Sequence, residues 1–343
     1  MKALVTGGGG FLGRAIVERL LARGDQVRSF ARGDYPALRE LGVQVIQGDL
    51  TDVASVADAC DGVDAVFHVA AKPGIWGSRD SFYGPNVVGT ENVIKSCRAH
   101  GVRRLVYTSS PSVVFGGTDL EGVNEDVAYP TRYHAHYPET KAIAERLVVA
   151  ANGPELATVS LRPHLIWGPG DNHLVPRILA RGRAGKLRRV GAGTNKVDSI
   201  YIDNAADAHL LAADRLAPGS AVAGKIYFLS NGEPLELSTL INGILAAGNL
   251  PPMQRSVSVG VARLAGSCLE TAYRIFNIAG EPVMTRFLAE ELGTAHWFDI
   301  SQARRDLGYA PRVTIEEGLK RLGRWLHAER DCASSASPVK VKL

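Results

Sequence analysis

A run of glycines directly after the first apolar segment constrains the fold of this chain more than any other feature. Residues 3–6 read as a short strand, and an amphipathic helical pattern follows over residues 11–22. Two overlapping motifs fit the loop between them: G-x-G-x-x-G through Gly8, Gly10 and Gly13, and G-x-x-G-x-x-G through Gly7, Gly10 and Gly13. Side chains would hold the backbone away from a pyrophosphate, whereas a helix N-terminus offers free N–H donors. The motif predicts a dinucleotide site, with an unliganded glycine turn as the alternative.

The first 160 residues alternate short β-branched runs with helical patterns. Candidate strands cover residues 3–6, 26–31, 43–47, 65–67, 105–109 and 157–161. Helical patterns over residues 11–22, 53–60 and 87–98 lie between them. This alternation predicts an α/β fold, a Rossmann-type doubly wound parallel sheet with helices on both faces. Ligands then bind at the carboxyl ends of the strands.

After Arg162-Pro163 the pattern becomes less regular, with Gly and Pro punctuation. We expect an NADP(H)-binding domain with the catalytic residues over 1–163, and a smaller, interleaved carboxyl-terminal substrate-binding region over 164–331. Residues 201–203 and 226–229 look like strands that return to the sheet. The Ser- and Lys-rich residues 332–343 are expected to form a flexible tail.

Charge and cysteine usage exclude several classes of protein. The net charge of +4 arises from interspersed charges, which argues against a nucleic-acid-binding arm. The four cysteines and nine histidines show neither disulfide nor metal-ligand spacing, so no metal site is predicted. No signal peptide precedes the first strand, and no apolar run approaches the ~20 residues that a membrane span needs. A soluble, cytoplasmic protein is predicted.

The end of the second strand bears on the choice of cofactor. An NAD site usually places a carboxylate there to bind the ribose 2′-hydroxyl, whereas this chain has Ala31 followed by Arg32. A guanidinium suits a 2′-phosphate, so NADP(H) is favoured. Alternatively, Arg32 stacks on adenine, and Asp34 is close enough to leave NAD(H) possible.

Tyr137 and Lys141 are the candidate catalytic pair. On a helix they lie at i and i+4, on one face. An ammonium beside a phenol lowers a phenol pKa that is ordinarily about 10, which makes Tyr137 a plausible proton donor and acceptor. The strand that ends near Ser110 would bring a hydroxyl to the same cleft, with Ser109 or Thr108 as alternatives.

These motifs together strongly resemble those of the extended short-chain dehydrogenase/reductases. The matching segments, in the family's order, are Gly7/Gly10/Gly13, Gly48-Asp49-Leu50, His68-Val69-Ala70-Ala71, Asn86-Val87-Val88-Gly89-Thr90, Thr108-Ser109-Ser110, Tyr137-x-x-x-Lys141 and Leu161-Arg162-Pro163. The resemblance implies that Ser110 orients a substrate carbonyl, Tyr137 exchanges its proton and Lys141 holds the nicotinamide ribose. Asn86 would support this geometry.

The resemblance also implies a set of residues that line the cofactor path. These are Gly7, Gly10, Phe11, Leu12, Gly13, Arg32, Asp49, Leu50, Ala70, Ala71, Lys72, Tyr137, Lys141 and Pro163. Simpler interpretations compete at some positions. Asp49 could be a turn residue and Asn86 a helix cap. His134 and His136 fit a solvated helix start better than a proton relay, and His68 fits a packed histidine.

The carboxyl half is similar to the sterol and 3β-hydroxysteroid dehydrogenase branch of that family. The similar segments are Thr108 to Gly116, Tyr201-Ile202-Asp203-Asn204, Trp297 to Ser301, Leu307 to Pro311 and Glu316 to Leu319. Within the branch, the chain resembles most the bacterial reductases of 2-alkyl-3-oxoalkanoates in long-chain olefin biosynthesis. The resemblance implies an NADPH-dependent, reversible reduction of a long-chain acyl substrate at C3. It also implies a homodimer through residues 87–98 and 137–150.

An apolar helical stripe agrees with a hydrophobic substrate. Its members are Val261, Leu264, Cys268, Leu269, Ala272, Ile275, Phe276 and Ala279, with Arg263, Ser267, Glu270, Arg274 and Asn277 on the opposite face. The simplest interpretation is a helix packed on the core. The alternatives are a lid over an acyl chain and a surface that contacts a membrane or a partner enzyme.

Three other functions compete with the reductase. A 3β-hydroxysteroid or sterol dehydrogenase would use the same residues with NAD. A sugar-nucleotide epimerase or dehydratase would retain NAD and bind a diphosphate through groups such as Asn172, Arg177 and Arg183. A redox sensor that binds NADP without catalysis would not need Ser110, Tyr137 and Lys141.

Overall fold

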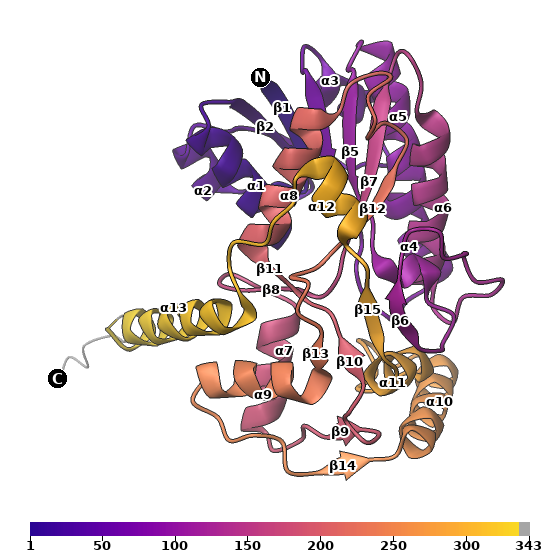
Figure 1. The fold of residues 1–343 in the computed structure, drawn as a ribbon, viewed down its shortest axis with the longest axis vertical. Coiled ribbons are helices and arrows are strands. Elements are labelled where there is room, and N and C mark those ends of the chain that lie inside the picture. The colour runs from indigo at the N-terminus through magenta and orange to yellow at the C-terminus, as the bar shows by residue number, and fades with distance from the viewer. Residues whose placement is uncertain (336–343) are drawn as a thin grey trace.

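A seven-stranded, fully parallel sheet forms the centre of the computed structural model, which describes residues 1–335 (Figure 1). Its order is β12-β7-β5-β4-β1-β2-β3. The strands are β1 (Lys2–Thr6), β2 (Gln26–Ala31), β3 (Gln44–Gln47), β4 (Ala65–His68), β5 (Arg104–Thr108), β7 (Ala157–Pro163) and β12 (Ile226–Leu229). Every residue of β7 is buried, as expected of a parallel sheet covered on both faces. The predicted Rossmann-type α/β fold is confirmed.

Helices cover both faces of this sheet (Figure 1). One layer contains α1 (Phe11–Ala22) and α8 (Ile202–Arg215), and the other contains α3 (Val53–Cys60), α5 (Gly89–Ala99) and α6 (His136–Ala151). Strand order reverses at β1, which pairs with β2 on one side and β4 on the other. The loops after β1 and β4 therefore diverge at their carboxyl ends and leave the crevice where doubly wound sheets bind ligands.

Smaller sheets lie beyond these strand ends, built from the carboxyl half of the chain together with the segment Leu120–Val123. One has the order β13 (Leu235–Glu236), β10 (Lys196–Val197), β15 (His296–Phe298) and β6 (Leu120–Val123); the two others pair β11 (Ile200–Tyr201) with β8 (Ile166–Trp167), and β14 (Ser256–Val257) with β9 (Arg189–Val190). The remaining helices are α2 (Pro36–Glu40), α4 (Arg79–Tyr83), a π-helix (Gly84–Val88), a 3₁₀ helix (Pro111–Val114), α7 (Leu174–Arg183), α9 (Leu237–Ala247), α10 (Val259–Ile275), α11 (Arg286–Gly293), α12 (Ser301–Leu307) and α13 (Ile315–Ser335).

The two halves interleave in space. Residues 226–229 return to the main sheet, as predicted, and β12 pairs with β7. Residues 201–203 do not: Tyr201 pairs with Trp167 in a separate two-stranded sheet, and Ile202 begins α8. Helix α13 continues to Ser335, into the segment predicted as a tail, and residues 336–343 lie outside the described part.

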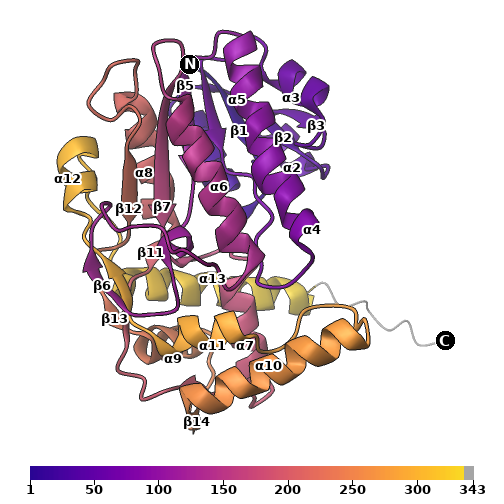
Figure 2. The ribbon, with the colours of Figure 1, turned by 90° about the vertical axis from the view of Figure 1, so that its right-hand side faces the viewer.

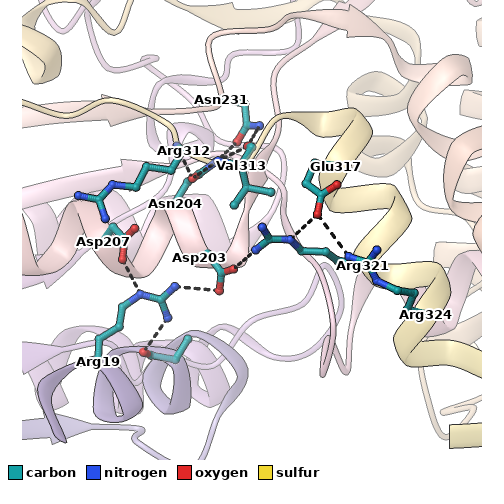
Figure 3. A network of polar contacts seen from close by, with 11 residues as sticks. Arg19, Asp203, Asn204, Asp207, Asn231, Arg312, Val313, Glu317, Arg321 and Arg324 are labelled. Carbon is teal, nitrogen blue, oxygen red and sulfur yellow. Dashed lines mark hydrogen bonds and ion pairs between the residues drawn. The ribbon is translucent and has the colours of Figure 1, made fainter. Parts of the chain in front are cut away.

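An ion-pair network ties the first helix of the sheet to the last helices of the chain (Figure 3). Arg19 of α1 binds Asp203 and Asp207 of α8, and Arg321 of α13 reaches Asp203 at 3.2 Å. Asn204 adds a buried bond to the backbone oxygen of Val313 at 2.7 Å. Because these contacts join residues far apart in sequence, the carboxyl-terminal segment stabilises the nucleotide-binding half.

The apolar stripe of helix α10 faces solvent, whereas the simplest prediction was that it packs on the core. Ala262, Gly266 and Glu270 are buried against α11, while most large residues of the apolar stripe face solvent. A Cβ on Gly266 would lie 2.6 Å from a backbone carbon of Thr285, so small residues permit this close approach. Glu270 accepts hydrogen bonds from the backbone N–H and the guanidinium of Arg286 at 2.7 and 2.9 Å. The stripe is therefore not a core-packing face.

Candidate active site

The glycine loop forms a backbone cradle at the end of β1. Gly7 has φ +71°, which favours glycine, and its N–H donates to the Phe30 oxygen at 2.8 Å. A Cβ on Gly13 would lie 2.1 Å from the Gly7 oxygen, so no side chain fits between the loop and α1. Gly10 caps α1 without a side-chain hydrogen bond, and the first turn of α1 carries no acid. This helix N-terminus fits a pyrophosphate of a bound dinucleotide.

Charged side chains follow the carboxyl ends of β2 and β3, where the adenosine part of the cofactor is expected to bind. Arg32 is exposed and forms no ion pair with the described residues, whereas Asp34 pairs with Arg39. Asp49 accepts hydrogen bonds from the N–H and hydroxyl of Thr51 at 2.9 and 2.8 Å, and these bonds lower the pKa of its carboxyl. Asp49 thus acts as a turn residue here, which leaves its expected role beside adenine a prediction.

Asn86 joins the loop after β4 to the helix that carries the catalytic pair. Its Oδ1 accepts from the N–H of Lys72 at 2.7 Å, and its Nδ2 donates to the Thr140 hydroxyl at 3.1 Å. Asn86 lies inside the π-helix, so the alternative of a helix cap is wrong. The three residues hold the Ala71-Lys72 segment against the turn of α6 that contains Lys141.

The three hydroxyls after β5 point in different directions. Thr108 bonds the buried His209 of α8 at 2.9 Å, and the buried Ser109 hydroxyl has no partner among the described residues. Ser110 bonds the hydroxyl of Ser112 at 2.9 Å, and it is also close enough to Tyr137 to lower the pKa of the phenol. Of the three, Ser110 is therefore the one that this geometry brings to the phenol.

Tyr137 and Lys141 share one face of α6, but the hydrogen bond that the ammonium makes goes to the end of β5 and not to the phenol. Lys141 donates to the Thr108 oxygen at 2.6 Å and lies 4.2 Å above the ring of Tyr107. Burial lowers the pKa of Lys141 to about 7. Burial raises the pKa of Tyr137 to about 12, against the smaller opposite effect of Ser110. The expected lowering of the Tyr137 pKa by Lys141 is thus wrong for this structure, because burial raises that pKa and the Lys141 ammonium is hydrogen-bonded to the end of β5.

A buried ion pair supports α6 one turn beyond Lys141. Glu145 receives hydrogen bonds from Nε and Nη2 of Arg162 at 2.9 and 2.7 Å, and from the Tyr129 hydroxyl at 2.7 Å. Both charged side chains are at most 1% exposed. Two parallel bonds in a low-dielectric interior fix the register of α6 against β7, the strand that ends at Pro163.

Two histidines beyond Pro163 were not anticipated from the sequence. His164 Nε2 and His296 Nδ1 lie 2.7 Å apart, and His296 Nε2 donates to the Glu291 oxygen at 2.8 Å. Leu165, the next residue, has the left-handed φ of +45°, which turns the chain away from the sheet. Burial lowers the pKa of both histidines. The position of His164 directly after Pro163 was the available sequence signal.

Two further residues near the site also escaped the sequence patterns. The ring of Tyr35 lies where a Cβ on Gly9 would be, 2.3 Å away, so it covers part of the glycine loop. Glu291 of α11 acts electrostatically on Tyr137, and burial raises the pKa of its carboxyl to about 7. Neither belongs to a recognisable motif, because both reach the site from segments distant in sequence.

The remaining histidines near the site have structural partners. His68 is buried between the hydroxyls of Thr6 and Thr90 at 2.8 and 3.0 Å, which confirms its prediction as a packed residue. His134 bonds Glu290 at 2.6 Å, and His136 lies 3.3 Å from Glu139. Within residues 1–335, no group of His, Cys, Asp and Glu could hold a metal ion. No helix of that part has both the length and the apolarity to cross a bilayer.

The sheet topology, glycine loop and Ser/Tyr/Lys geometry define a nicotinamide-dependent oxidoreductase of the extended short-chain dehydrogenase/reductase class. The 3-beta hydroxysteroid dehydrogenase/isomerase family matches residues 4–255, and the chain belongs to this family. A 2-alkyl-3-oxoalkanoate reductase of Stenotrophomonas maltophilia is 56% identical over 94% of this chain and 98% of its own length. A protein of the same name from Shewanella oneidensis is 52% identical over 93% of this chain and 85% of its own.

More distant relatives and solved structures agree with this class. A mouse sterol-4-alpha-carboxylate 3-dehydrogenase, decarboxylating, is 35% identical over 95% of this chain and 91% of its own. The solved structure of MoeE5 in complex with UDP-glucose and NAD has a TM-score of 0.74 at 25% identity and covers 96% of this chain and 100% of that one. The fold and the use of a nicotinamide cofactor follow from these likenesses.

Proposed function

We propose that this enzyme is an NADPH-dependent reductase that converts a long-chain 2-alkyl-3-oxoalkanoate to the 2-alkyl-3-hydroxyalkanoate, reversibly. The observation that carries the proposal is the 56% identity, over almost the whole of both chains, to a 2-alkyl-3-oxoalkanoate reductase. Sterol and 3β-hydroxysteroid dehydrogenases are 34–36% identical, so their substrates are the second candidate. A place in olefin biosynthesis, a cytoplasmic location and a homodimer through α5 and α6 are predictions from the family resemblance.

Tyr137 is the proposed proton donor. With a pKa of about 12, its phenol keeps its proton at neutral pH and is ready to donate it to a ketone oxygen. Ser110, which lies near enough to Tyr137 to lower its pKa, would donate a second hydrogen bond to the same oxygen as negative charge develops there. The bound nicotinamide would supply or accept the hydride.

Lys141 is proposed to hold the nicotinamide ribose. Its ammonium is buried and has one hydrogen-bond acceptor among the described residues, the Thr108 oxygen. An ammonium has three donors, so two are available to ribose hydroxyls. Asn86 and Thr140 would keep the neighbouring loop and helix in register for this contact.

Arg32 supports the preference for NADP(H). The side chain is exposed after the end of β2 and has no ion-pair partner within the described residues. The nearby carboxylate of Asp34 forms an ion pair with Arg39 instead. A free guanidinium binds a phosphate by charge-assisted hydrogen bonds. A ribose 2′-phosphate would therefore bind here better than a 2′-hydroxyl.

A substrate panel tests the proposal. The purified enzyme would be given a racemic long-chain 2-alkyl-3-hydroxy acid, a 3β-hydroxysteroid or UDP-glucose, each with NADP⁺ and with NAD⁺, and product formation would be followed by mass spectrometry. We expect oxidation of the hydroxy acid with NADP⁺. Turnover of the steroid alone, with NAD⁺, would replace the proposed substrate and cofactor. Epimerised UDP-sugar with retained NAD⁺ would change the reaction class.

A further inference from the structure

Helix α10 presents an unusually apolar surface to solvent. Val261, Leu264 and Ile275 lie on one face of the helix, because their spacings of three and eleven residues fit its period, and Phe276 follows at its end. Leu264, Ile275 and Phe276 are 66%, 70% and 73% exposed. Val283, beyond the helix, is exposed as well. We call Val261, Leu264, Ile275, Phe276, Ile278 and Val283 the α10 outer face.

Contacts on the other side of α10 fix this orientation. Glu270 is buried and binds Arg286 of α11, and Arg263 binds Glu290 of the same helix at 3.2 Å. Near the C-terminal end, Arg274 lies 5.5 Å from the ring centroid of Trp76. Turning the apolar residues inward would break these contacts and bring large side chains against the Thr285 backbone. The α10 outer face is therefore a stable property of the fold.

A basic segment lies at the same end of the molecule. Between Asp171 and Asp198 the chain has seven Lys or Arg residues and no Asp or Glu. It forms α7, β9 and β10, and β9 pairs with β14, the strand directly before α10 (Figure 1). In Figure 2, α7, β14 and α10 lie at the same end of the molecule. Arg183, Lys186, Arg188 and Arg189 are exposed and form no ion pairs among residues 1–335. Their charge is thus available to an external partner.

We propose that the α10 outer face and the basic segment together form a peripheral docking surface for an anionic lipid bilayer. Exposed apolar side chains beside unpaired basic residues are the combination that binds the boundary between head groups and acyl chains. A second copy docked by this same face would bring two basic segments together, which like-charge repulsion disfavours. The inference does not depend on the identity of the substrate.

The docking surface connects directly to the candidate active site. Glu290, which binds Arg263 of α10, also binds His134, three residues before Tyr137. Trp76, which contacts Arg274 and Tyr273 of α10, follows the Ala71-Lys72 segment expected to line the cofactor path. A bilayer held against α10 would lie beside elements that border the cleft. A substrate with long alkyl chains could enter from the lipid without crossing water.

Vesicle co-sedimentation of the full-length protein tests this proposal. The probes are vesicles of pure phosphatidylcholine and of phosphatidylcholine with an equal part of phosphatidylglycerol. We expect binding to the anionic vesicles that weakens as salt is raised. The apolar variant Leu264→Ser/Ile275→Ser/Phe276→Ser and the charge variant Lys186→Glu/Arg188→Glu should each bind about tenfold less or weaker still, because each removes one of the two attractions.

The control is Leu41→Ser/Val53→Ser, which removes two exposed apolar residues, 45% and 49% accessible, from the nucleotide-binding half. It should bind vesicles like the wild type. Circular dichroism and turnover of a short-chain, water-soluble hydroxy acid should be unchanged in every variant, which separates a docking failure from an error in the proposed function. The proposal is wrong if the wild type stays in the supernatant with both vesicle types. It is also wrong if the apolar variant dissociates a dimer without changing vesicle binding.

Discussion

Lys141 Nζ donates a hydrogen bond to the backbone oxygen of Thr108 at 2.6 Å, which joins the catalytic helix α6 to the end of β5. The ammonium is thereby held beside the strand that leads to Ser110. Its buried position explains why its pKa is lowered to about 7. In this arrangement Tyr137 keeps its proton, and Lys141 is placed to serve the cofactor.

The lowered pKa of Lys141 should make the free energy of unfolding depend on pH. The pKa of Lys141 is about 7 in the folded protein, whereas the ordinary value of 10.5 applies to the unfolded chain. Between pH 7 and pH 10.5 the unfolded chain therefore binds a proton at Lys141 that the native state does not. Stability therefore rises with pH across this window. Lys141→Met should be more stable than the wild type near pH 7, by a margin that shrinks toward pH 10. Denaturant unfolding at several pH values measures this, with the exposed Lys95→Met as control; a margin independent of pH would refute the lowered pKa.

Arg32→Ala should weaken NADP⁺ binding more than NAD⁺ binding. Loss of a charge-assisted contact to the 2′-phosphate predicts about 10- to 100-fold weaker NADP⁺ binding and little change for NAD⁺. Isothermal titration with each cofactor measures both. Lys95→Ala, another exposed cation, controls for the lost charge. Equal losses for the two cofactors would show that Arg32 stacks on adenine instead.

Removing one partner of the Glu145–Arg162 ion pair should destabilise the protein more than replacing both partners by apolar residues. Glu145→Ala leaves a buried guanidinium without its partner, which predicts a loss of about 3–5 kcal/mol in the free energy of unfolding. The double variant Glu145→Leu/Arg162→Met should recover most of that loss, because no unpaired charge remains. Urea unfolding measures both. A double variant as unstable as Glu145→Ala would show that the Tyr129 contact, not the charge, dominates.

The α10 outer face also predicts that the protein binds a hydrophobic dye. With six large apolar residues exposed at one end, the wild type should bind a fluorescent hydrophobic dye more strongly than Leu264→Ser/Ile275→Ser/Phe276→Ser. The fold should be the same in both, because these side chains make few contacts with the core. Equal dye fluorescence with unchanged circular dichroism would show that the residues are covered in solution.

The sequence predicted the sheet well because its signals are local. The glycine loop, the β-branched runs and the helices over residues 11–22 and 53–60 depend on neighbouring residues, and the structure reproduces both helices with the same ends. The face of α10 was not predictable in this way. Periodicity separates two faces but does not say which one meets the core, and that choice depended on Gly266 and Glu270 meeting α11.

In the candidate active site too, local features were predictable from the sequence and contacts between distant segments were not. The spacing of Tyr137 and Lys141 placed both on one face of α6, as the structure has them, but it could not give the reach of the lysine toward Thr108. His164 directly follows β7, His296 lies in β15 and Glu291 lies in α11, and only the folded chain brings these three residues together. Their spacing in the sequence carries no signal of this proximity.

The proposed role of Tyr137 is tested most directly by one kinetic comparison. Reduction of NADP⁺ by a long-chain 2-alkyl-3-hydroxy acid would be followed by the absorbance of the reduced nicotinamide, in the wild type and in Tyr137→Phe. Removal of a general acid–base group predicts a loss of about 10²- to 10⁴-fold in kcat, with NADP⁺ affinity retained. Rapid turnover by Tyr137→Phe, or none by a wild type that binds NADP⁺, would contradict the proposed function.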